Sequence, residues 1–146
     1  MTVSQTGPLA EALVARLKDA LKGKGLPDTE GAPAPDIPVS TKVRSGADRL
    51  AVRIEGFSML QGNSNVGHSD RHNFQVRVTH KETGKRKGDP AKDLPRIEGL
   101  ICDALKDFKP VPGATKIKFR GSFEADEPTP EHTSRVSRFY VNINGD

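Results

Sequence analysis

The stretch LPRIEGLICDALKDF, residues 94–108, carries the clearest periodic pattern in the chain and decides which fold we expect. Its apolar residues recur at spacings of three and four, the period of one face of an α-helix. These residues are Ile97, Leu100, Ile101, Ala104, Leu105 and Phe108. We predict a helix from about Asp93 to Phe108, with Pro95 in its first turn. Its apolar face, with Leu100 near the middle, should form the centre of the core.

A second helix is predicted near the N-terminus, where leucines recur every four residues. They are Leu9, Leu13, Leu17 and Leu21. We place this helix at about 8–22, with Pro8 in the first turn, where a missing amide hydrogen costs nothing. Gly23 and Gly25 then end it. Residues 25–38 hold four prolines, which disfavour both a helix and a central strand, so we expect a linker there.

Alternation of apolar and polar residues predicts strands in the rest of the chain. The first two, at 37–43 and 50–55, are separated by turn-forming residues, and we expect them to form a hairpin. A third strand is expected at 74–79, a fourth at 116–123 and a fifth at 138–143.

This element order, α-β-β-β-α-β-β, is typical of an α+β fold in which two helices pack on a mostly antiparallel sheet. The chain has 146 residues, which is the usual size of one domain, so we predict a single domain over 1–146. Between the elements we expect long polar loops at 58–73, 80–91 and 124–134.

Composition excludes several protein classes. No run approaches the ~20 apolar residues that cross a bilayer, and the N-terminus lacks the order of a secretion signal, so neither a membrane protein nor an exported one is expected. The single cysteine, Cys102, excludes an intramolecular disulfide framework and fits a reducing compartment. The net charge of +4 suits contact with an anionic polymer without requiring it.

Metal binding is a weak hypothesis. His68 and His72 lie four apart with Asp70 between them, but the helical His-Glu-x-x-His arrangement is absent, so we interpret both histidines as solvated loop residues. We likewise expect His80 and His132 at the surface. A metal-dependent enzyme remains an alternative that rests on this segment alone.

Nucleotide hydrolysis and nucleophilic catalysis have less support. Lys85 follows a glycine, but Arg86 stands where a phosphate-binding loop has Ser or Thr. Cys102 lies in the apolar stretch of the second helix, and we interpret it as a small, unreactive hydrophobic residue. The carboxylates Glu124 and Asp126 lie in a loop near prolines and suit solvation or docking. We predict no catalytic residue, no cofactor and no metal.

Basic side chains are the more informative feature. One cluster lies in the loop after the third strand and comprises Lys81, Lys85, Arg86 and Lys87. A second, Lys116, Lys118 and Arg120, has the solvent-facing parity of the fourth strand. Together they could bind a phosphate backbone or an acidic protein, or simply be solvated. An aromatic platform for base stacking is not expected, because Phe119 and Phe139 have the parity of the core.

The chain resembles the tail terminator (tail completion) proteins of long-tailed bacteriophages. The resemblance lies in the order and length of six segments. They are PLAEALVARLKDAL (8–21), IPVSTKV (37–43), NFQVRVTH (73–80), LPRIEGLICDALKDF (94–108), KIKFRGSF (116–123) and SRFYVNIN (137–144). Two segments, the Pro-rich stretch 26–38 and the loop GKRKG (84–88), have no counterpart in that pattern.

The resemblance implies a non-enzymatic virion protein that caps the tail tube. Such a protein would form a homohexameric ring, stop tube polymerisation and dock head completion or neck proteins. It would be assembled in the host cytoplasm and located in the virion tail, with DNA passing through the lumen. A tail tube subunit or another neck protein fits the same element order, and a basic nucleic-acid-binding module is the alternative from a different class.

Loops are the candidate subunit interfaces, because loops that have no role in a monomer can order against neighbours. We expect loops 58–73 and 124–134 to lie there. We also predict that the basic loop around Lys85 pairs between subunits with an acidic loop. The acidic residues are Glu124, Asp126, Glu127 and Glu131.

Overall fold

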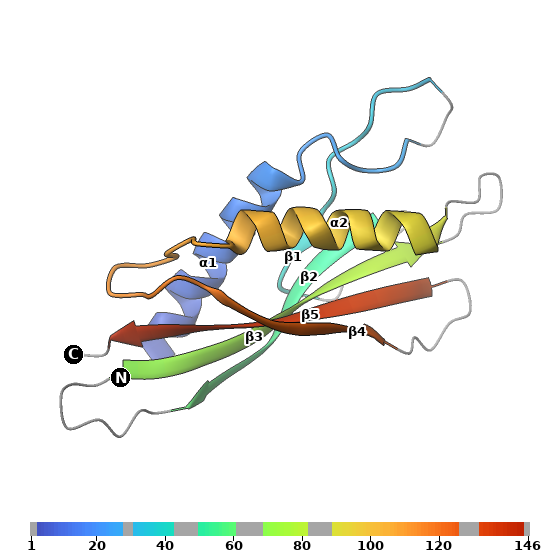
Figure 1. Ribbon diagram of the computed structural model, residues 1–146. Helices are drawn as coiled ribbons and strands as arrows, with labels where there is room; N and C mark the ends of the chain where they lie inside the picture. Colours follow the sequence, from blue (N-terminus) through green and yellow to red (C-terminus); the bar gives the residue numbers. More distant parts are fainter. Residues whose placement is uncertain are drawn as a thin grey trace.

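A computed structural model describes residues 3–27, 31–42, 50–60, 69–81, 89–125 and 132–144. Two helices and five strands occur in the order α1, β1, β2, β3, α2, β4, β5 (Figure 1). The helices are α1 (Val3–Ala20) and α2 (Pro90–Leu105). The strands are β1 (Val39–Ser40), β2 (Leu50–Leu60), β3 (Ser69–Lys81), β4 (Lys118–Ala125) and β5 (His132–Asn144). The α+β class and the element order predicted from the sequence are confirmed.

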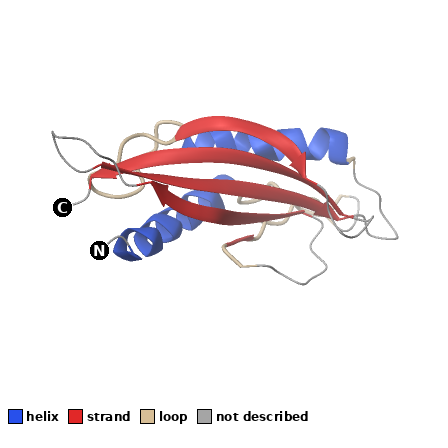
Figure 2. Cartoon of the chain, turned by 90° about the horizontal axis from the view of Figure 1, so that it is seen from below, coloured by secondary structure: helices blue, strands red, loops and turns tan. Residues whose placement is uncertain are grey.

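The strands form one sheet in the order β1-β2-β3-β5-β4. The pairs β2–β3, β3–β5 and β4–β5 are antiparallel, whereas β1 runs parallel to β2. Both helices lie on the same face of this sheet, so that seen from below the strands lie in front of them (Figure 2). The sheet therefore has one face covered by helices and one open face.

The core lies between the helices and the covered face of the sheet. From α1 and the turn that follows it, the core takes the predicted leucine stripe, whose four members, the last of them Leu21, are fully buried. From α2 it takes Leu94, Ile97, Ile101 and Leu105, and from the strands mainly valine, isoleucine and phenylalanine. Leu100 is only partly buried, so its predicted place at the centre is wrong. Leu100 instead packs against the core cluster as one of its partly buried neighbours.

Both helices begin earlier than predicted. α1 starts at Val3, which puts Pro8 inside the helix instead of in its first turn. α2 starts at Pro90, because the Asp89 side chain caps it by accepting the amide hydrogen of Ala91. Pro95 therefore lies beyond the first turn of α2. The helix ends at Leu105, since Lys106 is extended, so Phe108 lies outside it.

The Pro-rich stretch folds back onto the end of α1. Gly23 has a φ of 68°, the left-handed conformation that ends many helices. The amide of Gly25 donates to the carbonyl of Pro35, and the amide of Ile37 donates to the carbonyl of Leu21. In its described part the stretch contains no helix or strand before Val39, as predicted, but it closes a loop rather than running as an extended connection.

The predicted hairpin between residues 37–43 and 50–55 is wrong. Val39 lies beside Val52 in a parallel pair, and the amide of Val52 donates to the carbonyl of Pro38. The loop anchored at Leu21 sets the direction in which the chain enters the sheet. Alternation alone could not reveal that direction, since it is the same for parallel and antiparallel partners.

The central strands are longer than predicted and shorten the expected loops. β2 continues to Leu60 and β3 begins at Ser69. Residues 58–60 and 69–73 of the predicted loop 58–73 therefore belong to strands. Likewise, residues 80–81, 124–125 and 132–134 belong to strands. The pattern of apolar residues did not reveal these strand ends, because polar residues occupy their open face and histidines occupy their covered face.

Candidate interaction surface

The open face of the sheet is defined by the residues that alternate away from the core. In β3 these are the odd-numbered residues, because His72, Phe74, Val76 and Val78 are buried on the other side. The register then assigns Arg53 and Glu55 of β2 and the even-numbered residues of β5 to the same face. Val136, although buried, lies outside the core cluster, as expected for a residue on the open face.

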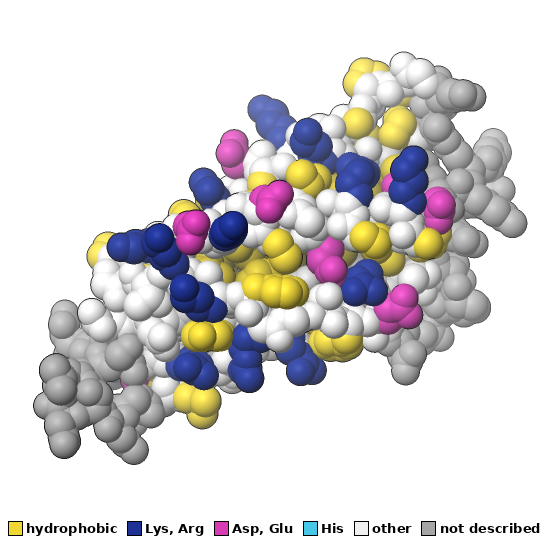
Figure 3. All heavy atoms as spheres, in the orientation of Figure 1, with side chains coloured by type: hydrophobic (Ala, Val, Ile, Leu, Met, Phe, Trp, Pro, Cys, Tyr) yellow, Lys and Arg dark blue, Asp and Glu magenta, His cyan; other side chains and the backbone are white. Residues whose placement is uncertain are grey.

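Cations dominate this open face. The described residues place seven Lys or Arg side chains and one acidic side chain, Glu55, on it. The register assigns six of these cations, and the hydrogen bond of Arg120 to Asn73 assigns the seventh. The seven are Arg53, Arg71, Arg77, Lys81, Lys118, Arg120 and Arg138. Lys and Arg side chains form a row beneath β4 and β5 along the lower margin of the molecule (Figure 3). The described part of the open face therefore carries a clear excess of positive charge.

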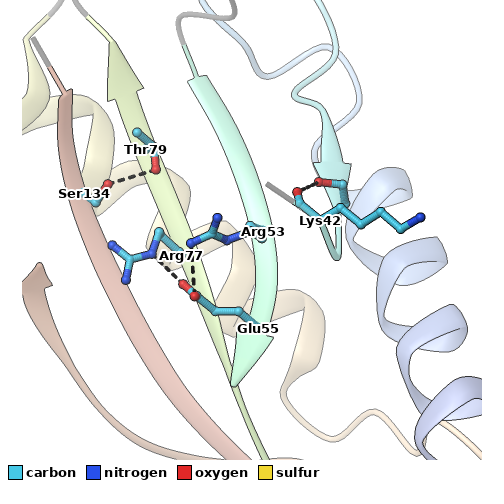
Figure 4. A network of polar contacts seen from close by, with 7 residues as sticks. Lys42, Arg53, Glu55, Arg77, Thr79 and Ser134 are labelled. Carbon is cyan, nitrogen blue, oxygen red and sulfur yellow. Dashed lines mark hydrogen bonds and ion pairs between the residues drawn. The ribbon is translucent and has the colours of Figure 1, made fainter. Parts of the chain in front are cut away.

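Glu55 bridges two of these arginines. Its carboxylate accepts hydrogen bonds from Nη2 of Arg53, at 3.1 Å, and from Nε of Arg77 (Figure 4). The three side chains are about one-fifth to one-quarter exposed and come from two adjacent strands. Beside them, the hydroxyls of Thr79 and Ser134 lie 2.9 Å apart and join β3 to β5. This half of the open face is a paired polar network.

The other half of the face holds arginines against aromatic rings. The guanidinium of Arg71 lies 4.3 Å from the ring centre of Tyr140, and that of Arg120 lies 6.0 Å from it. Arg138 lies 4.6 Å from the ring of Phe123. Such contacts attract a cation to the ring face and hold the guanidinium flat. Arg120 also donates to Oδ1 of Asn73 across the sheet, at 3.4 Å.

The three residues predicted as a basic face of the fourth strand are exposed, and two of them lie in β4. Lys116, Lys118 and Arg120 are all accessible to solvent. Lys116 lies just before β4, and its ammonium is 3.7 Å from a carboxylate oxygen of Asp107. Sequence reasoning missed the larger set to which two of these residues belong, because the other cations come from β2, β3 and β5.

The predicted loop clusters are only partly described. Lys81 ends β3 on the open face, and Glu124 lies on the covered side of β4. Glu124 lies 3.8 Å from Arg135, which also bonds to Glu98 of α2 at 3.3 Å. The remaining predicted loop residues lie outside the described residues. They are Lys85, Arg86, Lys87, Asp126, Glu127 and Glu131, and their pairing between subunits stays a prediction.

The prediction that no aromatic side chain accompanies the basic residues is wrong. A β-bulge between Phe119 and Gly121 shifts the register of β4 by one residue, so Phe123 lies on the open face. Gly121 has a φ of 122°, which other residues rarely adopt. Tyr140, which the alternation of β5 already put on the solvent side, completes the aromatic pair.

Phe119 has the predicted core parity but is 52% exposed. Its ring packs on Phe139, with centroids 5.6 Å apart, at the outer edge of the covered face. Because β4 is an edge strand, nothing in the described chain covers the far side of this ring. Hydrophobic side chains gather between α2 and β4 on the surface (Figure 3). This half-exposed ring and the free edge of β4 are together called the β4 edge below.

The histidine predictions need correction. His72 and His80 lie on the covered face of β3 and are 2% and 0% exposed, so neither is a surface residue. Nε2 of His80 is 3.8 Å from a carboxylate oxygen of Asp93 in the first turn of α2. His132 is partly exposed, and His68 lies outside the described residues. Among the described residues no cluster of three or more His, Cys, Asp or Glu could hold a metal ion.

Cys102 is partly buried on α2, in the environment that the sequence predicted. Burial raises the pKa of its thiol, and the nearby carboxylates Glu98 and Asp103 raise it further. A thiol with a raised pKa is a poor nucleophile at neutral pH, because little of it is thiolate.

Comparison with known proteins was made on the sequence and on the fold. No family model matches the chain, and no curated protein matches it. The fold, however, has a counterpart in a virion. The chain is similar to one in the solved structure "Virion of native gene transfer agent (GTA) particle", with a TM-score of 0.59 and 16% sequence identity. The match covers 73% of this chain and 78% of the other.

At this identity the match shows a shared fold and nothing finer. In the described chain neither helix is long and apolar enough to cross a membrane.

Burial of His72 should make the protein less stable in acid. Desolvation lowers the pKa of His72 below its usual value of 6.5, and Asp70 opposes this only partly. The unfolded chain therefore binds a proton at His72 more readily than the folded chain does. The stability contributed by neutral His72 is fully present above pH 6.5 and is lost as the pH falls below this value. We expect the free energy of unfolding, measured in urea from pH 8 to pH 5, to fall less steeply for His72→Gln. Equal slopes for both proteins would contradict this.

Proposed function

We propose that this protein is a non-enzymatic structural subunit of a virion, a tail terminator that forms a ring on the end of a phage-type tail tube. The observation that carries the proposal is the similarity of its fold to a chain in a gene transfer agent virion. The resemblance of its element order to tail terminators supports the same class. In this role the ring stops tube polymerisation and offers a docking surface to head completion or neck proteins.

The β4 edge supports an assembled state. An edge strand presents unpaired backbone groups that pair readily with another chain. Phe119 adds a large apolar side chain that is half exposed in the single chain. We therefore place a contact between neighbouring copies at the β4 edge, where a second chain would cover this ring.

The ring is tested by the mass and shape of the purified protein. We expect a closed ring of six 15.8 kDa subunits in sedimentation velocity and in negative-stain images. Phe119→Ser should shift the protein toward monomers, because it removes apolar area from the contact while the core below keeps Phe139. Lys92→Ser, an exposed change on α2, is the control and should leave the ring unchanged.

Two results would contradict the proposal. One is a monomer at every concentration reached, with the circular dichroism of a folded protein. The other is a ring that Phe119→Ser leaves intact, which would move the contact elsewhere. Long tubes of stacked rings would instead select the alternative, a tail tube subunit, because a terminator stops after one layer.

A further inference from the structure

The open face of the sheet has an unusual balance of charge for a surface with no partner. The described part of the face carries seven cations and one carboxylate, Glu55, which already bonds two of the arginines. Like charges on neighbouring strands repel one another, and they lower the stability of a sheet unless an anion lies between them. The arrangement therefore points to an anionic partner that lies across several strands.

Three arginines of this face are already positioned by contacts with aromatic rings. Arg71 and Arg120, from β3 and β4, lie against Tyr140 on the strand between them. Arg138 lies against Phe123 in the same way. A guanidinium held against a ring loses less freedom when it binds a partner. Planar guanidinium groups suit phosphate oxygens, which they bind in pairs.

Geometry favours a phosphate backbone over bases. The ring of Tyr140 already carries Arg71, so stacking of a base on that face is blocked. In its described part the face also follows the sheet and presents no helix or ribbon that could enter a groove to read base edges (Figure 2). Contacts of this kind bind nucleic acid through charge and without regard to its sequence.

We propose that the open face of the sheet binds the sugar-phosphate backbone of DNA, without sequence preference, through Arg71, Arg120, Arg138 and Lys118. This goes beyond the capping role and does not depend on it, because Phe119 and the helices lie on the other side of the sheet. A single folded subunit is sufficient for the contact.

The salt dependence of DNA binding tests this proposal. The probe is a fluorescent duplex of arbitrary sequence, and anisotropy is measured over a series of salt concentrations. For each phosphate that a cation neutralises, the slope of log affinity against log salt has a magnitude of about 0.9. The triple change Arg71→Gln, Arg120→Gln and Arg138→Gln should therefore reduce the slope by about three. Lys118→Gln alone, an exposed change at the start of β4, should reduce it by about one.

A charge-matched control separates the open face from net charge. Lys18→Gln, Lys22→Gln and Lys92→Gln remove the same number of charges from exposed positions on or next to the two helices. We expect the slope of this variant to equal that of the unchanged protein. A second DNA of different sequence should bind with the same affinity. Circular dichroism confirms that each variant is folded.

Four outcomes would overturn the proposal. These are no binding of DNA at low salt, an equal loss in the control variant, a slope that Lys118→Gln does not change, and binding of polyglutamate but not of DNA. The last would identify an acidic protein as the partner. Repeating the titration with Phe119→Ser keeps this test apart from the ring: a monomer that still binds DNA supports the open-face contact even if the capping role fails.

Discussion

Replacement of Ile101 by Asp should abolish the folded state. Ile101 is fully buried on α2, between the helix layer and the sheet. A carboxylate there would have no described cation to pair with, and burying it unpaired costs several kcal/mol. That is a large part of the roughly 5–15 kcal/mol by which domains are stable. Circular dichroism and one-dimensional NMR of the purified variant measure the outcome.

Ile101→Ala tests the burial of the same side chain, with a smaller expected loss of stability. We expect it to lower the free energy of unfolding in urea by about 2–5 kcal/mol, through lost apolar contact and a cavity. Lys92→Ala, exposed on the same helix, should change it by no more than about 0.5 kcal/mol. Leu100→Asp should be better tolerated than Ile101→Asp, because Leu100 is partly exposed. A folded Ile101→Asp protein would show that this face of α2 is not in the core.

Gly25→Val should open the loop that ties the Pro-rich stretch to α1. A side chain added at Gly25 would place its Cβ 2.7 Å from the carbonyl oxygen of Pro35, the same atom to which the Gly25 amide donates. Backbone must therefore move, and the variant should lose about 1–3 kcal/mol, as for other overpacked sites. Urea unfolding monitored by circular dichroism measures the loss.

The control for this prediction is Gly99→Ala. Gly99 is exposed on α2, and nothing lies within 4 Å of an added Cβ. Alanine is the better helix former, so this variant should gain about 0.5–1 kcal/mol. If Gly25→Val were as stable as the unchanged protein, the loop between Gly25 and Pro35 would not contribute to the fold.

The sequence was most informative where one face of an element is purely apolar. The leucine stripe of α1 and the residues Ile97, Ile101 and Leu105 of α2 were predicted in the core, and they are fully buried. It was less informative where a polar residue occupies a buried position. His72 and His80 continue the covered face of β3, but an imidazole in a sequence looks like a surface group. As a result, the ends of β3 were assigned to loops.

The interaction surface was harder to predict because it depends on pairing between strands. Lys118 and Arg120 were identified within one segment, but their neighbours Arg71 and Arg138 come from strands elsewhere in the chain. The register, together with the contacts of Arg120 to Asn73 and Tyr140, brings these four side chains onto one face. The place of Phe123 depends further on a bulge, which alternation cannot reveal because it interrupts the alternation itself.

That bulge lets one short strand serve two unrelated contacts. Before it, β4 turns Phe119 toward the helix layer, and after it the strand turns Phe123 toward the opposite side. Without the bulge that accommodates Arg120 as an extra residue, strict alternation of the same sequence would put Phe123 on the same side of the sheet as Phe119. The length of this segment, more than the chemistry of any one residue in it, therefore keeps the site for neighbouring subunits separate from the site for an anionic chain.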